Sequence, residues 1–376
     1  MEDYRILPVN EAYNDQILRI MEAAPIQAKG LVIRFDKSPD VFALPRMKYS
    51  ECFHVGFFSD ESLKGVASLG FHNSLIEGKE ENIFTLFNFY ILPEARGNHL
   101  SARAIREFIP LIRERARYGI AITMRGNKPA ESYISHTGNS FLPPSCIIDR
   151  LCIKSIILSS PRKNQTPFNV RNAVIEDITE ITALLNTEHR QRFMGLRFTD
   201  EGILENLKIR GLNVSDYYVA VNRSGRIAGV CLAWDSQTFR RTTVVRISPA
   251  LLPFLLSYRL MSGVLPIAAF PAKGDCFREL TITDYAVADR NVQIMNALLC
   301  EVYRRNLNRK YHFINFGSCM TDDLLRAADS FWHFNTVSSI VFTSLDTDKF
   351  NIPVRLPYID IAFFYITLYN THIYST

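Results

Sequence analysis

Apolar and polar residues alternate in the same order along two distant stretches of the chain. The first, FHVGFFSDESLKGVAS, covers residues 53–68, and the second, YYVAVNRSGRIAGVCL, covers residues 217–232. They align without a gap. In each, an apolar strand meets a polar turn and then a second strand that carries Gly-Val. This pattern predicts a β-hairpin in each stretch.

The segments around each hairpin also repeat. Upstream, YRILPVNEAYNDQILRIMEAA and FNVRNAVIEDITEITALLN each predict a strand followed by a helix. Downstream, each hairpin is followed by a long apolar strand, NIFTLFNFYIL or FRELTITDYAVA, and then by a helix, a strand, a second helix and closing strands. We therefore expect an α+β protein in three layers. Two tandem copies of one unit each contain a twisted, mixed, mostly antiparallel sheet flanked by helices.

The polar segment SSPRKNQTPFN, residues 159–169, separates the two copies and predicts a linker. The first domain is then residues 1–158 and the second is residues 170–376. The second copy is longer because it contains an apolar insert around residues 240–275, which includes ALLPFLLSYRLMSGVLPIAAF. This run carries Arg259 near its centre and two prolines, so we expect a buried or groove-lining helix rather than a membrane span.

Composition narrows the class of protein. The 376 residues are 47% apolar and 12% aromatic, which suits two soluble domains. The net charge of +5 comes without a dense basic tract or a motif that reads nucleic acid. Seven scattered cysteines without a CxxC pair, and no signal sequence, favour a cytoplasmic protein. We expect no nucleic-acid or membrane partner. No cluster has zinc spacing, so we expect no metal.

The run PEARGNHLS, residues 93–101, carries the strongest chemical signal. It follows the apolar strand NIFTLFNFYIL and precedes the helical segment SARAIREFIPLIRERARYG. At such a junction several backbone N–H groups point the same way, and the helix dipole lies behind them, so an anion is favoured. Taken alone, the run could equally be a solvated turn.

The element order and this junction together resemble the GNAT superfamily of acyl-CoA-dependent N-acyltransferases. Nearly the whole chain, to about residue 345, resembles a tandem pair of such domains. The family's Pro-x-x-Arg-Gly-x-Gly-x-Gly/Ala junction corresponds to residues 93–101, although His99 stands in place of a glycine and Ser101 in place of glycine or alanine. The resemblance implies that backbone N–H groups and one guanidinium bind the pyrophosphate of coenzyme A. The residues expected to do so are Arg96, Gly97, Asn98, His99, Leu100 and Ser101.

The resemblance also implies that the strand before this loop splays, pairs with the pantetheine arm and polarises the thioester carbonyl. The matching residues are 88–92, with Ile91 and Leu92 as the main-chain contacts. In RGNKPAESYISHTG, Asn127 resembles the family's asparagine, and Tyr133 resembles the tyrosine that protonates the leaving thiolate. Tyr133 lies one residue closer to the asparagine than is usual, and a tyrosine packed on the sheet is the alternative.

A general base is harder to assign. Glu80 and Glu81, at the start of the strand that leads to the coenzyme loop, are candidates that could act through a water molecule. The alternative is that their charged turn, IEGKEEN, is simply solvated. His72 and His54 are weaker candidates, because a lone histidine is more often structural.

These observations predict an N-acetyltransferase that moves the acetyl group of acetyl-CoA to a primary amine of a small molecule or peptide, bound in the cleft facing the second domain. In the second copy, the junction AVADRNVQIMNALL lacks glycine and carries Asp289, so we expect coenzyme binding to be lost there. Two alternatives stay open. One is a non-catalytic binding module, and the other is a site in the second copy formed by Arg290 and residues 291–294.

Overall fold

The computed structural model describes residues 4–28, 30–124, 143–161, 167–308, 310–345 and 355–363. Within these residues the strands form a large sheet of twelve strands and a small sheet of four. The large sheet contains, in spatial order, β1 (Tyr4–Pro8), β4 (Glu51–Ser59), β5 (Ser62–Ile76), β6 (Lys79–Ile91), β7 (Tyr118–Met124), β16 (His333–Ser344), β8 (Ser145–Ile157), β15 (Phe313–Cys319), β14 (Glu279–Val287), β11 (Ile227–Trp234), β10 (Tyr217–Val221) and β9 (Asn169–Asn172). The small sheet contains β13 (Cys276–Phe277), β12 (Arg241–Ile247), β3 (Leu31–Asp36) and β2 (Ile26–Ala28).

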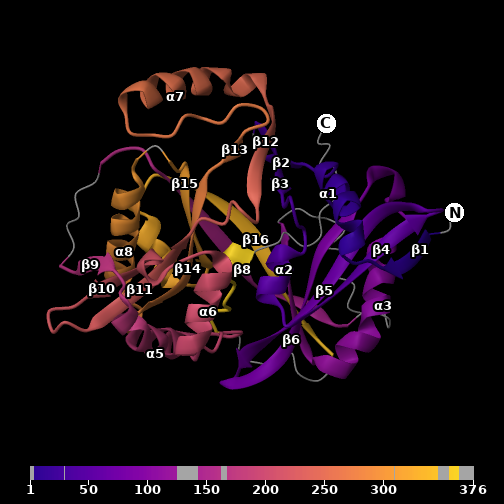
Figure 1. Cartoon of the computed structure of the whole chain (residues 1–376), viewed down its shortest axis with the longest axis horizontal. Helices are drawn as coiled ribbons and strands as arrows, with labels where there is room; N and C mark the ends of the chain where they lie inside the picture. Colours follow the sequence, from indigo (N-terminus) through magenta and orange to yellow (C-terminus); the bar gives the residue numbers. More distant parts are fainter. Residues whose placement is uncertain are drawn as a thin grey trace.

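The large sheet repeats the same arrangement from both of its edges. From one edge it runs β1-β4-β5-β6-β7, and from the other it runs β9-β10-β11-β14-β15. The predicted hairpins are β4–β5 and β10–β11. Most neighbouring strands are antiparallel, whereas β6 pairs with β7, and β14 with β15, in parallel. The α+β class with two copies of a mixed, mostly antiparallel sheet is therefore confirmed (Figure 1).

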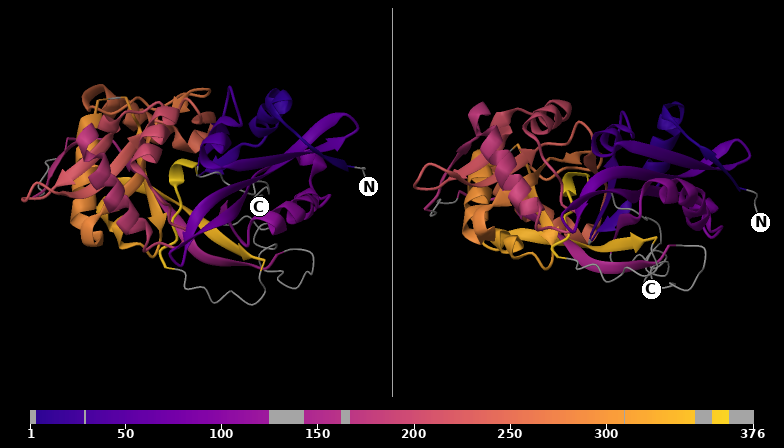
Figure 2. Two further views of the ribbon diagram at one scale, coloured as in Figure 1. Left: turned by 60° about the horizontal axis from the view of Figure 1, so that its bottom comes forward. Right: turned by 90° about the horizontal axis from the view of Figure 1, so that it is seen from below.

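Helices cover both faces of each half (Figures 1 and 2). In the first half, α3 packs on one face and α1 on the other. In the second half, α8 and α5 take the corresponding faces. The α-helices of the described residues are α1 (Asn14–Glu22), α2 (Ala43–Lys48), α3 (Leu100–Arg115), α5 (Ile178–His189), α6 (Asp200–Arg210), α7 (Leu252–Val264) and α8 (Val292–Asn306).

The two halves exchange their closing strands at the centre of the large sheet. β16, from the end of the second copy, lies between β7 and β8, and β8, from the end of the first copy, lies between β16 and β15. β16 pairs antiparallel with β7 over Ser338–Ser344 and with β8 over His333–Thr343. The sequence predicts closing strands in each copy, but the exchange between copies was not predicted. The boundary at residues 159–169 stays a prediction.

An apolar cluster joins the halves at the exchanged strands. Ile340 and Phe342 of β16 are buried together with Ile120 and Ile122 of β7 and Leu151 of β8. Because these side chains come from both copies, neither copy can bury the cluster alone.

A β-bulge interrupts β6 near its end. Phe84 and Leu86 precede the bulge and Phe89 and Ile91 follow it, yet all four pack in the cluster that contains α3. Strict alternation would place residue 89 on the opposite face, so the strand must accommodate one additional residue. The bulge is at Asn88, whose φ is 54°, and the register with β5 shifts at the same place.

β14 has a bulge at the corresponding position. Leu280, Ile282, Tyr285 and Val287 share the cluster that contains α8, with the same spacing as in β6. Asp284, between the two pairs, has a φ of 43°. The two copies therefore share a detail of backbone geometry as well as their order of elements.

The apolar insert contains α7, which lies on the outside of the molecule beside the small sheet (Figure 1). None of its residues is buried, so the expectation of a buried or groove-lining helix is wrong. The expectation rested on the apolar composition of the insert. However, among the described residues α7 packs one face on the segment 266–270, through Phe254 and Tyr258, and leaves its other face uncovered.

We expect fragments of residues 1–161 and 162–376 to be unfolded when they are produced separately. Each would lack the strand that closes its sheet, so β7 or β15 would have an unpaired edge next to exposed apolar surface. Produced together, they should form a folded complex. Circular dichroism and size-exclusion chromatography of each fragment and of the pair test this expectation. A cooperative thermal transition from either fragment alone would contradict it.

Candidate functional site

The loop between β6 and α3, residues 92–99, leaves open space in front of the start of the helix. Gly97 and His99 have φ angles of 84° and 53°, so the backbone enters the left-handed region twice. A β-carbon added at Gly97 would have no atom within 4 Å. The side chain of His99 is exposed and makes no cap hydrogen bond. His99 therefore does not fill the space.

The backbone N–H groups of residues 97–101 have no hydrogen-bond partner in the part of the chain that the structure describes. The Arg96 N–H donates to the carbonyl of Pro93 at 3.3 Å, and the Asn98 side chain donates to the carbonyl of Ala95 at 3.2 Å. These bonds hold the turn and leave the next N–H groups available. With α3 behind them, these N–H groups have the placement that favours an anion; that they bind one stays a prediction.

Two of the predicted coenzyme contacts are partly used within the protein. The Nε of Arg96 donates to the carbonyl of Ile91 at 3.3 Å. The N–H of Leu92 donates to the carbonyl of Lys64 at 2.9 Å. Because the Ile91 carbonyl and the Leu92 N–H are used in this way, main-chain pairing with a pantetheine arm would depend on the residues of β6 before Ile91.

β6 and β7 separate beyond their short ladder. Within the described residues they pair only where Ile83–Thr85 lies beside Tyr118–Ile120. β6 nevertheless runs on to Ile91, and β7 continues to Met124 beside β16. Residues 86–91, which include the bulge, thus lie outside the ladder with β7. This is the splayed strand that the family resemblance implies.

The second copy lacks an equivalent loop. β14 ends at Val287 and α8 begins at Val292, so residues 288–291 stand where the first copy has residues 92–99. The side chain of Asn291 caps α8 by accepting a hydrogen bond from the backbone N–H two residues further on, at 2.8 Å. The loop that leads to α8 is thus shorter, and the start of α8 is already capped.

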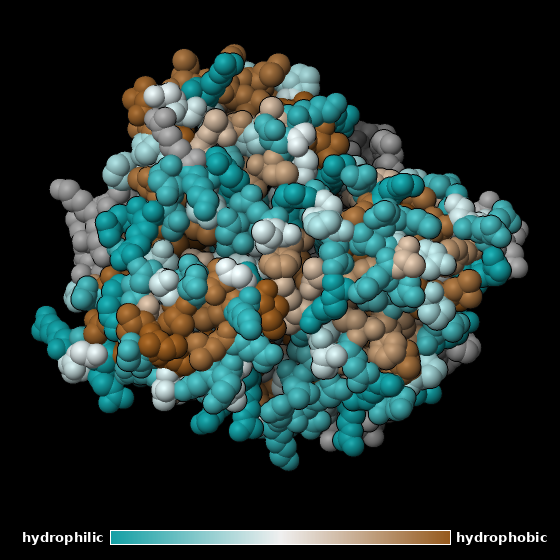
Figure 3. Space-filling model, in the orientation of Figure 1, coloured by the Kyte–Doolittle hydropathy of each residue, from teal (hydrophilic) through white to brown (hydrophobic). Residues whose placement is uncertain are grey.

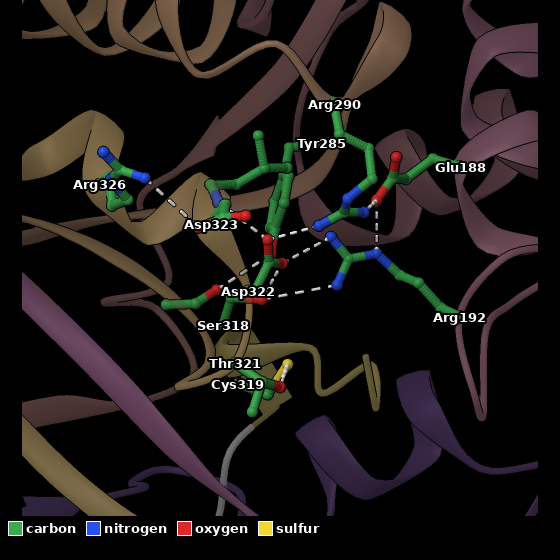
Figure 4. A network of polar contacts seen from close by, with 12 residues as sticks. Glu188, Arg192, Tyr285, Arg290, Ser318, Cys319, Thr321, Asp322, Asp323 and Arg326 are labelled. Carbon is green, nitrogen blue, oxygen red and sulfur yellow. Dashed lines mark hydrogen bonds and ion pairs between the residues drawn. The ribbon is translucent and has the colours of Figure 1, made fainter. Parts of the chain in front are cut away.

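Arg290 is held by two carboxylates (Figure 4). Its guanidinium pairs with Glu188 of α5 and with Asp322 after β15. Arg192 pairs with the same two carboxylates at 2.8 and 2.9 Å. The side chains of Glu188, Arg192 and Asp322 are 3%, 1% and 0% exposed. These ion pairs engage the guanidinium of Arg290, which a pyrophosphate site in the second copy would need.

The four charges of this network, on Arg192, Arg290, Glu188 and Asp322, balance one another. Burial opposes the ionisation of Asp322, but the charge of Arg192, a hydrogen bond from Ser318 at 2.6 Å and the charge of Arg290 hold the pKa of its carboxyl below the ordinary value. Two guanidinium groups thus face two carboxylates, and every charge has a partner. The geometry does not favour coenzyme binding in the second copy.

A cavity of about 320 Å³ lies between the two halves. Its walls come from the end of α2, from β5, β6 and β7, from α6, β10, β11 and β14, and from residues 358–363. Phe87, next to the bulge at Asn88, lines the cavity, and so does Asp284, which is itself the bulge residue of β14. The cavity therefore lies between the two bulges, and its volume suits a small ligand or part of a larger one.

Ionisable groups from both halves line this cavity. Asp284 pairs with Arg210 at 3.1 Å and accepts a hydrogen bond from the Tyr217 hydroxyl at 3.2 Å. Burial lowers the pKa of Lys48 to about 8, although the charge of Asp360 opposes that shift. Burial also raises the pKa of Asp360. The cavity can thus receive a polar group, in the place where the sequence analysis expects an amine.

A buried cation binds the bulge residue in each half. Lys37 Nζ donates to Asn88 Oδ1 at 2.7 Å, and Arg210 binds Asp284. Lys37 is 2% exposed, and burial together with the charge of Arg240 holds the pKa of its ammonium well below the ordinary value. Sequence reasoning missed both cations. The broken alternation along β6 could have revealed the bulge, but nothing local identifies a partner 51 positions away.

The two predicted glutamate bases lie at the far end of β6 from the coenzyme loop. At about 3.3 Å per residue, Glu81 is roughly 30 Å along the strand from Ile91. Glu80 lines the cavity and accepts a hydrogen bond from the Asn73 side chain at 2.8 Å. The structure therefore does not bring these glutamates together with the loop at residues 92–99.

The two histidines are half-buried, and both are neutral at pH 7. His72 lines the cavity, and burial, with the charge of Lys48, lowers the pKa of its ring to about 3. Burial, with the charges of Lys37 and Arg46, lowers the pKa of His54 to about 4. Their low basicity makes both poor proton acceptors at neutral pH.

Asn127 and Tyr133 lie outside the described residues. Among the residues that are described, no group of three or more His, Cys, Asp or Glu side chains could hold a metal ion. In the same part of the chain, no helix has the length and apolarity needed to cross a membrane.

The fold belongs to a known class. The fold is similar to that of solved N-myristoyltransferase structures, in agreement with the tandem α+β fold that the sequence resemblance predicted. It is similar to Saccharomyces cerevisiae N-myristoyltransferase with bound myristoyl-CoA and inhibitors, with a TM-score of 0.59 and 12% identity over 91% of this chain and 80% of that chain. Two further structures of that enzyme with bound myristoyl-CoA give TM-scores of 0.57, at 12% and 11% identity. They cover 92% and 91% of this chain and 79% and 83% of theirs.

Comparison of the sequence gave no match. No protein-family model and no curated protein matches the chain. At such low identity the structural likeness establishes the fold, and the activity must be argued from the site itself.

We expect the free energy of unfolding to fall as the pH drops from about 6.5 toward 4. The pKa of His54 is about 4 in the folded protein, against an ordinary 6.5, so in this range the unfolded chain binds more protons and stability decreases with pH. The contribution from His54 is roughly 2 kcal/mol between pH 7 and 4.5. His72 acts in the same direction.

Urea unfolding of wild type and His54→Gln at both pH values measures this effect. The glutamine amide can keep the bond that His54 Nδ1 makes to Ser68 Oγ at 2.8 Å, but it does not titrate. The difference in stability between the two pH values should shrink in the variant. An equal difference in both proteins would mean that His54 titrates normally when folded.

Proposed function

We propose that this protein is an acyl-CoA-dependent N-acyltransferase whose first half binds the coenzyme and whose central cavity receives the amine. The observation that carries the proposal is the run of backbone N–H groups at residues 97–101. These groups lack partners among the described residues and lie at the start of α3, directly after the splayed end of β6. A diphosphate would supply acceptors for these donors, and the helix dipole and the nearby Arg96 favour its charge.

The chemistry follows from where the loop and the cavity lie. A coenzyme held at residues 97–101 with its pantetheine arm along residues 86–91 would bring its thioester close to the bulge at Asn88. A bulge turns backbone groups out of the ladder, so an N–H there can polarise the thioester carbonyl. The cavity beside Phe87 would present the amine to the same place. Alignment of the two reactants then supplies much of the rate enhancement.

The attacking amine must lose a proton, and we propose Lys37 as the acceptor. Its Nζ lies 2.7 Å from the Asn88 side chain, whereas the glutamates lie at the other end of β6. Burial, with the charge of Arg240, lowers the pKa of Lys37, so a larger fraction is neutral at pH 7. Tyr133 remains the proposed proton donor to the leaving thiolate, and Asn127 remains a proposed coenzyme contact.

Lys37→Met is expected to lower kcat by about a hundredfold or more, the usual contribution of a general base. Asn88 binds Lys37, and the charge of Arg240 and the ring of His54 lie near it; neither the amide nor the guanidinium is basic enough to take over, and the pKa of His54 is lowered to about 4. The rise of kcat/KM with pH on the acidic limb, which reports deprotonation of the base, should flatten in the variant. A lower kcat with an unchanged pH profile would make Lys37 a positioning residue for Asn88, and the proton would have another acceptor.

The donor is an acyl-CoA of undetermined chain length. The sequence analysis expects acetyl-CoA. The likeness to an enzyme crystallised with myristoyl-CoA makes a long-chain acyl-CoA the second candidate. Affinities measured for a series from acetyl-CoA to myristoyl-CoA distinguish the two, because each methylene buried on binding adds about 0.8 kcal/mol.

Gly97→Asp is expected to abolish binding of coenzyme A, whereas Gly97→Asn is expected to keep most of it. The two side chains have the same shape and the same φ strain at 84°, but only aspartate places a negative charge against the diphosphate. Calorimetry on both variants measures the difference. Asp289→Asn in the second copy is the matched control and should leave affinity unchanged.

Wild type should gain about 2.7 kcal/mol of stability when coenzyme A is present at about 100 times its dissociation constant. Equal binding by Gly97→Asp and Gly97→Asn would place the coenzyme elsewhere. If wild type shows neither binding nor stabilisation with any acyl-CoA, the protein is the non-catalytic tandem module instead.

A further inference from the structure

The outer face of α7 presents a continuous apolar stripe to solvent. Leu252, Leu256, Leu260 and Val264 recur at every fourth position and are 54%, 64%, 76% and 84% exposed. Residues four apart lie on one side of a helix, so these side chains form a ridge along it. Figure 3 shows the apolar atoms gathered over α7 at the top of the molecule. Apolar surface of this extent on one element indicates a contact with something else.

The inner face fixes α7 in this orientation. The Tyr258 hydroxyl donates to the carbonyl of Ala268 at 3.0 Å. The ring of Phe270 lies 5.7 Å from that of Tyr258 and 6.5 Å from that of Phe254. Ile267 is buried in the same returning segment. Because one face of the helix is anchored by these contacts, the apolar ridge faces outward as a defined feature of the fold.

The charged residues of the segment that contains α7 are all basic. Residues 236–274 contain no aspartate or glutamate. Of the basic residues in this range, Arg246, Arg259 and Lys273 are exposed. Arg259 lies on α7, where its long apolar stem can lie along the ridge while its guanidinium reaches outward. An apolar ridge that carries Arg259 and lies on a segment without acidic residues between positions 236 and 274 complements a surface that is apolar inside and anionic outside.

A lipid bilayer that contains anionic headgroups is such a surface. α7 has thirteen residues, so it is about 20 Å long, shorter than the hydrocarbon core of a bilayer, which is about 30 Å thick. No helix of the described residues is long and apolar enough to span a membrane. A helix of this length whose inner face is bound to its own protein can only lie in the plane of the surface.

We propose that α7 is a membrane-docking helix that holds the protein on an anionic lipid surface. Its apolar ridge enters the boundary between headgroups and acyl chains, and Arg246, Arg259 and Lys273 contact the headgroups. The proposal replaces the expectation that the protein has no membrane partner. It stands on α7 alone and does not depend on acyl transfer.

Co-sedimentation of the full chain with phosphatidylcholine vesicles, with and without phosphatidylserine, tests the proposal. Wild type should bind the vesicles that contain phosphatidylserine, less tightly as salt is raised. Leu256→Asp with Leu260→Asp should weaken binding by about a hundredfold or more, because two leucine side chains no longer enter the apolar layer. Replacing Arg246, Arg259 and Lys273 by glutamine should weaken it about fivefold for each residue.

Ile209→Asp on α6 is the matched control, since Ile209 is 47% exposed and lies outside the ridge. It should bind like wild type. Circular dichroism should show all the variants folded, because none of the substituted side chains is buried. The proposal is overturned if wild type does not bind the anionic vesicles or if the leucine variant binds them equally well. It is also overturned if ultracentrifugation shows a dimer that the leucine substitutions dissociate, since the ridge would then be an interface between two copies.

Discussion

The bulge at Asn88 is the constraint on which the arrangement of the candidate site depends. An additional residue in β6 shifts its register with β5, although that pairing continues to Ile91, and the ladder with β7 ends at Thr85, shortly before the bulge. The bulge also puts a polar side chain in the interior, where it needs a partner, and Lys37 supplies one at 2.7 Å. The buried lysine and the approach to the cavity at Phe87 thus both lie at this bulge.

The two halves show how one framework can hold different chemistry. Each has the bulge and a cation bound to it, in one half Lys37 with Asn88 and in the other Arg210 with Asp284. In the first half the loop before α3 is long and its N–H groups face open space. In the second half the loop is short, and the Arg290 network fills the corresponding region. There the guanidinium of Arg290 is paired with Glu188 and Asp322.

Much of the fold could be predicted from sequence because its signals are local. The hairpins, the strand that leads into a helix and the repeat itself all follow from alternation, turn residues and helical spacing. The loop at residues 93–101 was also identifiable, since proline, arginine and glycine stand together after a strand. The apolar pattern of β6 also indicates the bulge, because the step from residue 86 to residue 89 breaks the period of two.

The remaining features depend on contacts between distant residues. β8 and β16 are both apolar strands near the end of a repeat, and neither sequence says which sheet it will join. Lys37 has no pattern of its own until Asn88 is placed beside it. The insert that contains α7 shows a different limit of prediction from sequence. Its apolar composition indicates that its side chains will be in contact with something, but it does not identify what they contact. The folded positions of such residues are set by the whole chain.

The exchanged strands also impose an order on biosynthesis. β7 and β8 leave the ribosome long before β16, the strand that lies between them, has been translated. At ordinary elongation rates of about 5 to 20 residues per second, the nascent first half waits roughly ten to forty seconds with its sheet unfinished. An open strand edge is prone to pair with other chains during such an interval. Chaperone capture of the growing polypeptide, or fast synthesis of its final third, would therefore govern how much of this protein a cell obtains in native form.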